Sequence, residues 1–564
     1  MDTTENKPPA NSEVYTKEQY EADIAAVEKT KLGGIFPIIK KEIPRVLLSC
    51  ITYFVVGYVY AFLRQFKDCV LYDVLETSAA NWLKVIVFFS SFLIINITTG
   101  FLQNYGVNKG TDIFIIFMAV LFAAFSILVF VKDFLCPLGA TEEFLNGNVF
   151  QLRGLTILSH ILPLFNHFIM VIFYVIYESF GSILMSFVFM TYLNSKLTPN
   201  QMGRYIRWIY IFANLSLIAV SYSVKNIVNA ADSFFSASRK YILYGSVCLV
   251  VSAMLMGVLG LKKLMDREFN KELYAGALDQ KAENKKKKVK PGFGTAIRLV
   301  FGSKLLFCLT VMSLGYNLSS VIASTISKQA YGAYKSYLID NPHLITEPGF
   351  NPNIIPYSYS MSENSLTAMI VIFLMLTPVF AKMFKILGVF TFATITLCCC
   401  MFSAITSVIF AAINYPYTNY GSGILFGIKF SSTAPVFKTE CSFAMISNML
   451  IKIGKYAFYD IVKENVATRI DPSVRALYKG VFDGVAAKGG KMLGSILGII
   501  LANITGVKDA RYSTPFFSAV VLLIAIGWFF CIIDLHRNYK YAVENDTFLQ
   551  DKGVKKGEVE DLKK

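Results

Sequence analysis

Long runs of apolar residues constrain this chain more than any other feature. Several of them exceed the ~20 residues that a helix needs to cross a bilayer. Hydrophobic residues make up 55% of the sequence and charged residues only 16%, whereas a soluble domain usually carries about 25% charge. A soluble fold would have to bury several helices of spanning length completely. We therefore predict an all-α polytopic membrane protein.

The apolar runs divide into twelve candidate transmembrane helices, six on each side of a polar, lysine-rich stretch. The predicted spans are 44–66, 80–103, 111–132, 160–194, 204–228, 240–262, 297–323, 363–386, 388–413, 434–463, 481–505 and 514–536. Twelve spans in a 6+6 arrangement are typical of major-facilitator-like transporters. The pseudo-symmetry is inferred from hydropathy alone.

The same pattern predicts five segments. They are a cytoplasmic N-terminal tail (1–40), an N-terminal six-helix bundle (41–262), a basic cytoplasmic linker (263–294), a C-terminal six-helix bundle (295–536) and a cytoplasmic C-terminal tail (537–564). Residues 326–362 are expected to form a long outer loop. Charges interrupt the tenth span, so we expect it to be broken or to line an aqueous cavity.

Basic residues next to the first span orient the chain. Lys40, Lys41 and Arg45 precede or begin that span, and cytoplasmic loops are enriched in Lys and Arg. Both termini are therefore predicted to be cytoplasmic, and the net charge of +16 needs no nucleic acid to explain it. The first 30 residues lack the apolar core of a signal peptide. We expect the plasma membrane, with a mitochondrion-derived organelle membrane as the alternative.

Residues 455–495 carry many charges although strongly apolar sequence lies on either side. Charge near or inside a bilayer is costly unless it is paired or faces water, so it marks a functional site by default. On a helix, Lys463 and Glu464 follow Asp460 by three and four residues, which places all three on one face. A solvated, salt-bridged helix end is the alternative interpretation.

Two further charged groups interrupt apolar runs in the N-terminal half. Arg64, Lys67 and Asp68 stand at i, i+3 and i+4 and share a face near the end of the first span. Glu178 lies in the middle of the fourth span, where a carboxylate must be protonated, paired or exposed to water. Lysine and arginine are the side chains that bind phosphates. Several of them at membrane depth indicate an anionic metabolite as the substrate, although Arg64, Lys67 and Asp68 alone could be an interfacial snorkelling group.

The sequence offers little for an enzyme. Residues 484–492 superficially resemble a phosphate-binding loop, but Met492 stands where a Ser or Thr would hold magnesium, and no strand precedes the loop. The ten cysteines show no zinc or disulfide-framework spacing. We expect no catalytic residues, no metal and no cofactor.

Four segments, in order along the chain, share motifs with one transporter family. Residues 63–68 match L-R-x-x-K-D, residues 173–178 are similar to F-Y-V-x-x-E-L-W, and residues 458–464 are similar to F-D-x-x-K-E with one inserted residue. Residues 479–491 resemble K-G-K-A…D…G-K-S. The chain thus resembles the nucleotide transporter family of bacterial and plastid type, the ATP/ADP translocases of obligate intracellular parasites and plastids.

Some positions depart from the family pattern. Tyr316, Ser319 and Lys328 align with it in the seventh helix, but Ser324 falls where the family has a glutamate. The missing carboxylate bears on the choice between ATP and GTP and on strict exchange. The other departures are Ser179-Phe180 in place of Leu-Trp, and Met492 in place of Ser. The divergence resembles that of a eukaryotic-parasite branch.

The resemblance implies roles for particular residues. Lys67, Glu178 and Lys463 correspond to substrate-binding or transport-critical positions. Further candidates are Arg64, Asp68, Asp460, Glu464, Lys479 and Lys491. The family implies exchange of ATP for ADP by alternating access, which would supply host ATP to a parasite. GTP and GDP are further candidate substrates, and we expect no obligate protein partner and no nucleic acid.

Two other functions stay open at the level of sequence. A proton-coupled major-facilitator carrier for another organic or phosphate anion would use Glu178 as its proton site. A membrane enzyme or lipid-modifying protein would use the charges between residues 429 and 491. Preference for a nucleotide over inorganic phosphate or lipid separates the three.

Overall fold

The structure is a computed structural model, and nearly all of the chain that it describes is helical. It describes residues 17–29, 38–70, 80–131, 164, 167–197, 199–234, 240–270, 300–345, 350–418, 435–470, 478, 481–482, 486–507, 509–545 and 547–549. Within these ranges there is no strand. The prediction of an all-α polytopic membrane fold is confirmed.

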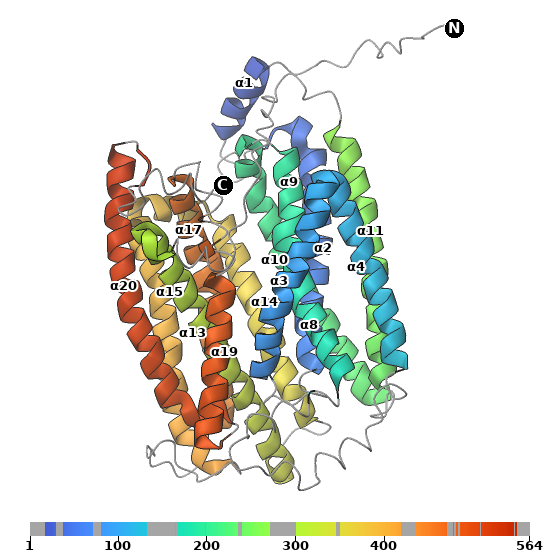
Figure 1. The fold of residues 1–564 in the computed structure, drawn as a ribbon, viewed down its shortest axis with the longest axis vertical. Coiled ribbons are helices and arrows are strands. Elements are labelled where there is room, and N and C mark those ends of the chain that lie inside the picture. Colours follow the sequence, from blue (N-terminus) through green and yellow to red (C-terminus); the bar gives the residue numbers. More distant parts are fainter. Residues whose placement is uncertain are drawn as a thin grey trace.

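The first group of helices forms an N-terminal bundle (Figure 1). Its members are α2 (Ile43–Val70), α3 (Ala80–Asn104), α4 (Gly106–Phe130), α8 (Phe168–Ser182), the π-helix η5 (Ile183–Phe189), α9 (Met190–Lys196), α10 (Pro199–Phe234) and α11 (Lys240–Phe269). The helix α2 packs on α8, α10 and α11, and α11 also packs along α4. Two short elements precede the bundle, α1 (Lys17–Glu28) and η1 (Lys40–Glu42).

The second group forms a C-terminal bundle beside the first (Figure 1). Its long helices are α13 (Lys304–Asp340), α14 (Ile355–Leu376), α15 (Pro378–Asn414), α16 (Phe437–Ile453), the π-helix η11 (Gly454–Tyr459), α17 (Asp460–Thr468), α19 (Ala486–Thr505) and α20 (Thr514–Glu544). Short 3₁₀ turns connect them at η8 (Pro342–Leu344), η9 (Pro352–Ile354), η10 (Tyr415–Tyr417) and η13 (Ala510–Ser513).

Local sequence signals explain several helix boundaries. Ser303 caps α13, because its hydroxyl accepts a hydrogen bond of 3.0 Å from the Leu306 amide. Proline occupies the first turn of α14, α15 and α20, where its missing N–H costs no helical hydrogen bond. Gly388 has φ of 70° and kinks α15 in its first third.

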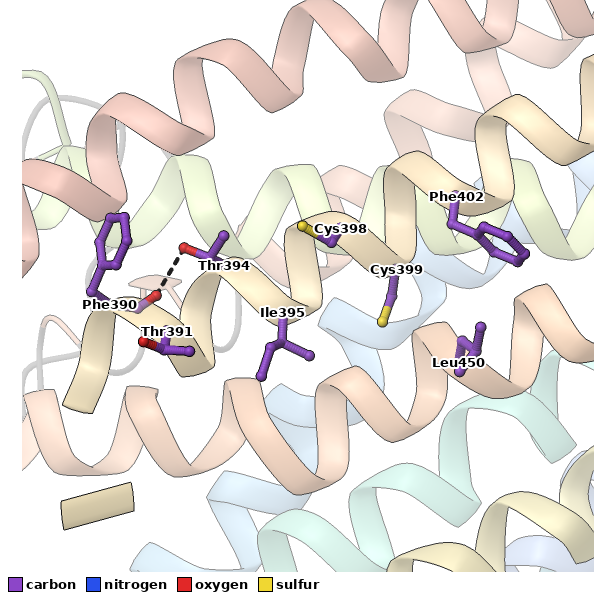
Figure 2. Close-up of a pocket in the computed structure, with 8 residues that line it drawn as sticks. All are labelled: Phe390, Thr391, Thr394, Ile395, Cys398, Cys399, Phe402 and Leu450. Carbon is purple, nitrogen blue, oxygen red and sulfur yellow. Dashed lines mark hydrogen bonds between the residues drawn. The ribbon is translucent and has the colours of Figure 1, made fainter. Parts of the chain in front are cut away.

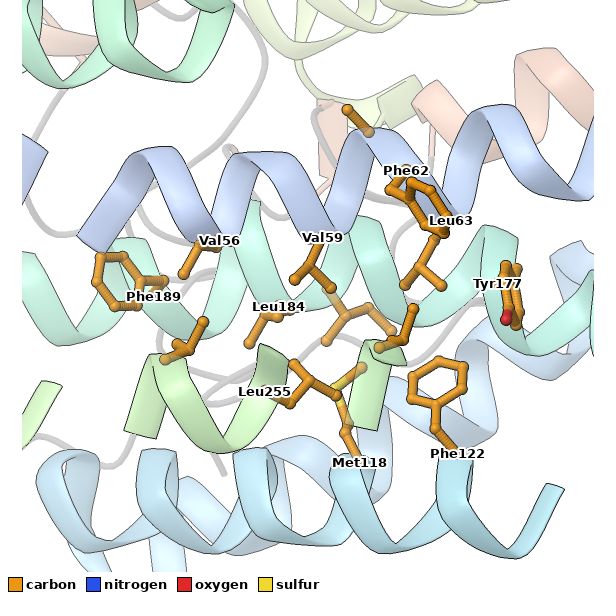
Figure 3. Packing of buried hydrophobic residues seen from close by; sticks show 14 of the residues in the cluster. Val56, Val59, Phe62, Leu63, Met118, Phe122, Tyr177, Leu184, Phe189 and Leu255 are labelled. Atoms are coloured by element: carbon orange, nitrogen blue, oxygen red, sulfur yellow. The ribbon is translucent and has the colours of Figure 1, made fainter. Parts of the chain in front are cut away.

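Aromatic and branched side chains fill the N-terminal bundle. Phe173 and Tyr177 stack with ring centroids 4.0 Å apart, and Phe122 meets Tyr177 edge-on at 5.4 Å. Figure 3 shows the interlocking side chains in the middle of the bundle, which come from α2, α4, α8, η5 and α11. Helices in lipid associate through close packing because both helices and lipid tails are apolar. This fit fixes the position of α8, which carries Glu178.

Among the described residues, the most extensive contacts between the two bundles join two pairs of helices. The helix α10 packs on α14, and α3 packs on α19. Tyr357 and Met361, in the first half of α14, belong to the buried cluster of the N-terminal bundle. In the second half of α19, a Cβ at Gly498 would lie 2.6 Å from the side-chain amide of Asn81. We call the end of the molecule that carries α1 the α1 end (Figure 1). These contacts lie toward the other end.

Small residues let α19 approach α13 closely. A Cβ at Gly490 would lie 2.6 Å from the Leu314 carbonyl oxygen, and one at Gly494 would lie 3.3 Å from the Leu318 oxygen. Both glycines are buried. Glycine at every fourth position of α19 therefore makes a flat packing surface, as small-residue rows do in membrane helices.

The helices differ from the predicted spans in number and length. Nine described helical runs are long and apolar enough to cross a membrane. The second, tenth and eleventh predicted spans correspond to α3, α16–α17 and α19, which are helical but outside that set. The count of twelve therefore stays a prediction.

The predicted outer loop, 326–362, is largely helical. The helix α13 continues to Asp340 and α14 begins at Ile355. Ala330, Tyr331 and Ala333 are buried, so this polar sequence remains helical because neighbouring helices cover it. The predicted boundary between the eighth and ninth spans, near 387, coincides with the kink at Gly388 inside α15. A further break, which was not predicted, lies at Thr377, where Pro378 prevents α14 from continuing.

A matched pair of glycine substitutions tests the packing of α19. We expect Gly490→Ala to lower the thermal unfolding midpoint of the purified protein, because overpacking costs about 1–3 kcal/mol. Gly489→Ala is the control, since a Cβ there meets nothing within 4 Å and alanine raises helix propensity. Equal midpoints for the two variants would contradict the close contact of α13 with α19.

Candidate functional site

The Lys67 ammonium is the centre of a buried ion network. Its Nζ lies 3.0 Å from Glu178 Oε2 and 3.0 Å from Asp68 Oδ1. It also donates to the Tyr174 hydroxyl at 3.5 Å and lies 4.8 Å from the centroid of that ring. Only 6% of the Lys67 side chain is exposed. Two carboxylates and an aromatic face replace the water that this ammonium loses.

The network is built from two helices with simple sequence spacing. Lys67 and Asp68 are consecutive residues near the end of α2. Tyr174 and Glu178 are four apart on α8, so both present the same face to α2. The predicted grouping of Lys67 with Asp68 is confirmed, and Glu178 joins them from another helix.

Asp68 extends the network to the C-terminal bundle. Its Oδ1 accepts a hydrogen bond of 2.7 Å from Lys328 on α13. A second contact lies beside it, where Lys84 on α3 donates to the Thr325 hydroxyl at 3.2 Å. Asp68 therefore holds two lysines, one from each bundle. These polar contacts fasten the bundles on the side away from the α1 end.

Arg64 and Lys491 both interact electrostatically with the Glu178 carboxylate. Arg64, one helical turn before Asp68, donates to the Tyr60 hydroxyl at 3.5 Å and interacts with Tyr456 of the other bundle. Lys491 on α19 is exposed, and its strongest charge interaction is with Glu178. The charge of Glu178 interacts with those of Lys67, Lys491 and Arg64. The structure thus brings Arg64, Lys67, Asp68, Glu178 and Lys491 together.

The predicted candidates on the tenth span form a separate pair. Lys463 Nζ lies 3.1 Å from Asp460 Oδ1, as the i, i+3 spacing predicts, and 5.9 Å from the Tyr459 ring centroid. Asp460 remains 31% exposed. The side chain of Glu464 and all of Lys479 lie outside the described residues.

Sequence reasoning missed other charges of this interior. Lys84 was not singled out, although a lone lysine in an apolar run is a signal. Glu363 on α14 is buried, pairs with Lys452 at 2.5 Å and accepts from Asn448 at 3.2 Å. Glu363 is the first residue of its predicted span, and a charge at the end of a span is common and does not by itself indicate a site. No local pattern reveals that it meets α16.

A surface groove between α15 and α16 offers a contrast to this interior (Figure 2). Its lining is mainly apolar, and its one drawn hydrogen bond runs from the Thr394 hydroxyl to the Phe390 carbonyl at 2.8 Å. The lining residues are Phe390, Thr391, Thr394, Ile395, Cys398, Cys399, Phe402 and Leu450. No charged group lines the groove, so it does not suit an anion.

The sequence of this chain matches a known transporter family. Residues 24–539 match the family described as TLC ATP/ADP transporter. The chain belongs to this family. The match spans both helix bundles, including the four segments whose motifs resembled ATP/ADP translocases, and confirms that resemblance.

Curated relatives are similar over nearly their full length. The chain is 25% identical over 527 residues to "ADP,ATP carrier protein 1" of Encephalitozoon cuniculi (strain GB-M1), covering 91% of this chain and 89% of that protein. It is 24% identical to "ADP,ATP carrier protein 1" of Paranosema grylli, with 92% of each chain covered. For the protein of that name in Rickettsia bellii (strain RML369-C), the identity is 20%, with 91% and 96% covered.

Two solved structures are similar at lower identity. A bacterial homologue of the iron transporter ferroportin, in its inward-facing state, has 13% identity and a TM-score of 0.49 over 87% of this chain and 98% of that one. A POT family transporter in complex with 5-aminolevulinic acid has 11% identity and a TM-score of 0.46, over 86% and 96%.

Substitutions at Asp68 and Lys328 test the strength of the ion pair that joins the two bundles. We expect Asp68→Asn to lower the thermal unfolding midpoint markedly, because breaking a buried ion pair costs about 3–5 kcal/mol. Lys328→Gln combined with Asp68→Asn should cost less than the sum of the single changes, with a coupling of about 0.5–3 kcal/mol.

The control for this cycle is the exposed pair of Lys304 and Asp534. Their side chains are 57% and 41% exposed although they lie 2.5 Å apart, so Lys304→Gln and Asp534→Asn should couple by at most about 1 kcal/mol. Additive effects at Asp68 and Lys328 would show that their contact does not hold the bundles together.

Proposed function

We propose that this protein is a nucleotide carrier that exchanges ATP for ADP across a membrane by alternating access. Family membership supports the proposal, and one observation carries it. Five basic side chains around the Lys67–Glu178 pair have no carboxylate within ion-pair distance among the described residues. They are Arg64, Lys84, Lys455, Lys488 and Lys491.

Such an excess of positive charge suits a polyanion. An unpaired cation that is shielded from water is costly, and like charges that lie close together repel one another, so a ligand with several negative charges stabilises the group. ATP and ADP carry such charge on adjacent phosphates, whereas a sugar or a cation offers none. Lysine and arginine donors also match phosphate oxygens geometrically. GTP and GDP satisfy the same requirement.

The carboxylates of the site complete the proposal. Asp68 and Glu178 form ion pairs with Lys67 and Lys328. Lys463 forms an ion pair with Asp460 and contacts the substrate from the C-terminal bundle. Glu464 and Lys479 keep the candidate roles that the family resemblance implies. Exchange of partners between carboxylate and phosphate would connect binding to movement of the bundles.

Alternating access fits the contacts between the bundles. Asp68–Lys328 and the α3–α19 contact lie away from the α1 end. With both termini in the cytoplasm, as proposed from the positive charges beside the first span, the structure corresponds to a carrier closed to the outside. We place this multi-pass protein in the plasma membrane of a parasite that imports host ATP, with an organelle membrane as the alternative.

Uptake of labelled ATP by bacteria that express the protein tests the proposal. We expect saturable uptake, and release of the label when unlabelled ADP or ATP is added outside. Glu178→Ala and Lys463→Ala should reduce uptake to the level of cells without the protein, because each removes a charge partner of the site. Lys540→Gln is the control, because the Lys540 side chain is 65% exposed and its contact with Glu544 is long, at 3.8 Å.

The competing outcomes separate the alternatives. Uptake without release by external nucleotide would replace exchange by uniport or proton symport. Proton-dependent uptake of another anion, with no nucleotide transported by protein shown to be in the membrane, would refute the nucleotide proposal. It would also favour Glu178 as a proton site.

A further inference from the structure

The tenth helix changes its form in the middle of the C-terminal bundle. It runs as α16, the π-helical turn η11 and α17. At the end of η11, the Asp460 amide donates to the Lys455 carbonyl, five residues back. A π turn holds one more residue than an α turn, is rare, and occurs frequently at functional sites. The contacts of η11 with its neighbours therefore need an explanation.

The helix α15 contacts one face of η11 at two points. The Thr396 hydroxyl donates to the Gly454 carbonyl at 2.9 Å. The rings of Phe392 and Phe458 meet with their centroids 5.1 Å apart. On each helix the two contacting residues are four apart and therefore share a face. The helix α15 thus follows η11 over a full turn.

Thr396 is well placed to hold this backbone. It is completely buried, and its hydroxyl lies 3.5 Å from the Phe392 carbonyl of its own helix, farther than from Gly454. The missing side chain of Gly454 permits the approach, because a Cβ there would lie 3.4 Å from Thr396 Cα. A π turn interrupts the regular pattern of helical hydrogen bonds, so a donor from a neighbouring helix stabilises it.

Another face of η11 is directed toward α13 and the N-terminal bundle. The Tyr459 ring stacks on Tyr316 of α13 with centroids 5.7 Å apart, and Lys455 Nζ lies 5.8 Å from the centroid of the same Tyr316 ring. Between them in sequence, Tyr456 interacts with Arg64 of α2. Tyr456 therefore connects this turn to the other bundle.

The form of the turn decides where Tyr456 lies. Replacing the π turn by an α turn would shift the register by one residue, which corresponds to a rotation of about 100° around the helix. The helix α16 is kept from rotating, because Lys452, just before η11, pairs with Glu363 of α14 at 2.5 Å. The rotation would then fall on the residues of η11, and Tyr456 would leave Arg64.

We propose that Thr396 is a positioning residue for transport: its hydroxyl holds η11 in the π form, which places Tyr456 against Arg64 of the other bundle. The inference rests on the proposed function, because the role that it assigns to Thr396 is in nucleotide exchange. Thr396 acts through the backbone of η11. Without its hydroxyl the Gly454 carbonyl loses this donor, the turn relaxes, and the contact between the tenth helix and α2 is lost.

Exchange of labelled ATP in expressing bacteria tests this role with three variants of α15. Thr396→Val keeps the shape of the side chain and should lower the maximal exchange rate by about two- to tenfold, the factor that corresponds to one net hydrogen bond. Thr396→Ser keeps the hydroxyl and should restore most of the rate. Thr394→Val is the matched control and should leave the rate unchanged, because the Thr394 hydroxyl bonds only within its own helix, to the Phe390 carbonyl at 2.8 Å.

A double-mutant cycle with Tyr456→Phe separates positioning from a merely structural role. Tyr456→Phe removes the hydroxyl near Arg64 and should lower both the exchange rate and the thermal unfolding midpoint of the purified full-length protein. In the Thr396→Val background it should lower neither quantity further, because Tyr456 has already left Arg64. The unfolding midpoint is measured without substrate, so it tests the contact independently of transport.

The outcomes distinguish this role from the proposed function. An exchange rate in Thr396→Val equal to that in Thr394→Val would overturn the positioning role, as would a Thr396→Ser variant as slow as Thr396→Val. Additive effects of Thr396→Val and Tyr456→Phe on either quantity would overturn it too. Wild-type protein that exchanges no nucleotide would refute the proposed function, whereas non-additive unfolding midpoints in that protein would still support Thr396 as the residue that holds η11.

Discussion

The cost of removing charge from water governs this molecule. Lys67 is almost fully buried within a bundle of apolar helices, and it is tolerable there only because Asp68 and Glu178 surround it. Those carboxylates lie on α2 and α8, and Asp68 also reaches Lys328 on α13. The arrangement of three helices, and the meeting of two bundles, therefore depends on satisfying one ammonium and its partners.

Basic side chains of the interior fall into two classes with different consequences. Those of the first class face a carboxylate, and one of them, Lys328, joins the two bundles through Asp68. Those without one, such as Lys488 and Lys491, keep a positive potential where water still reaches some of the groups, since Lys491 is exposed. The same interior thus combines an ion pair between the bundles with basic side chains that face no carboxylate among the described residues.

Packing decides where these charges stand. In lipid, helices gain little from the hydrophobic effect between them, so close fit matters most. Glycines on α19 bring it against α13, which sets the depth of Lys488 and Lys491 beside them. The π-helical turn η11 changes the register of the tenth span at Lys455 and Tyr456. The glycines of α19 and the π-helical turn η11 thereby determine where Lys455, Lys488 and Lys491 lie.

Much of this protein follows from its sequence, because membrane burial is a strong local constraint. Apolar runs predict the helices, and spacing of three or four residues predicts the pairs Lys67–Asp68 and Asp460–Lys463. The length of α13 was not predictable, since neighbouring helices keep its polar second half helical. Contacts such as Lys328 with Asp68 and Lys452 with Glu363 join residues far apart in the chain. Sequence determined which charges enter the membrane, and only the tertiary structure decided which of them are neutralised, because that depends on which helices pack together.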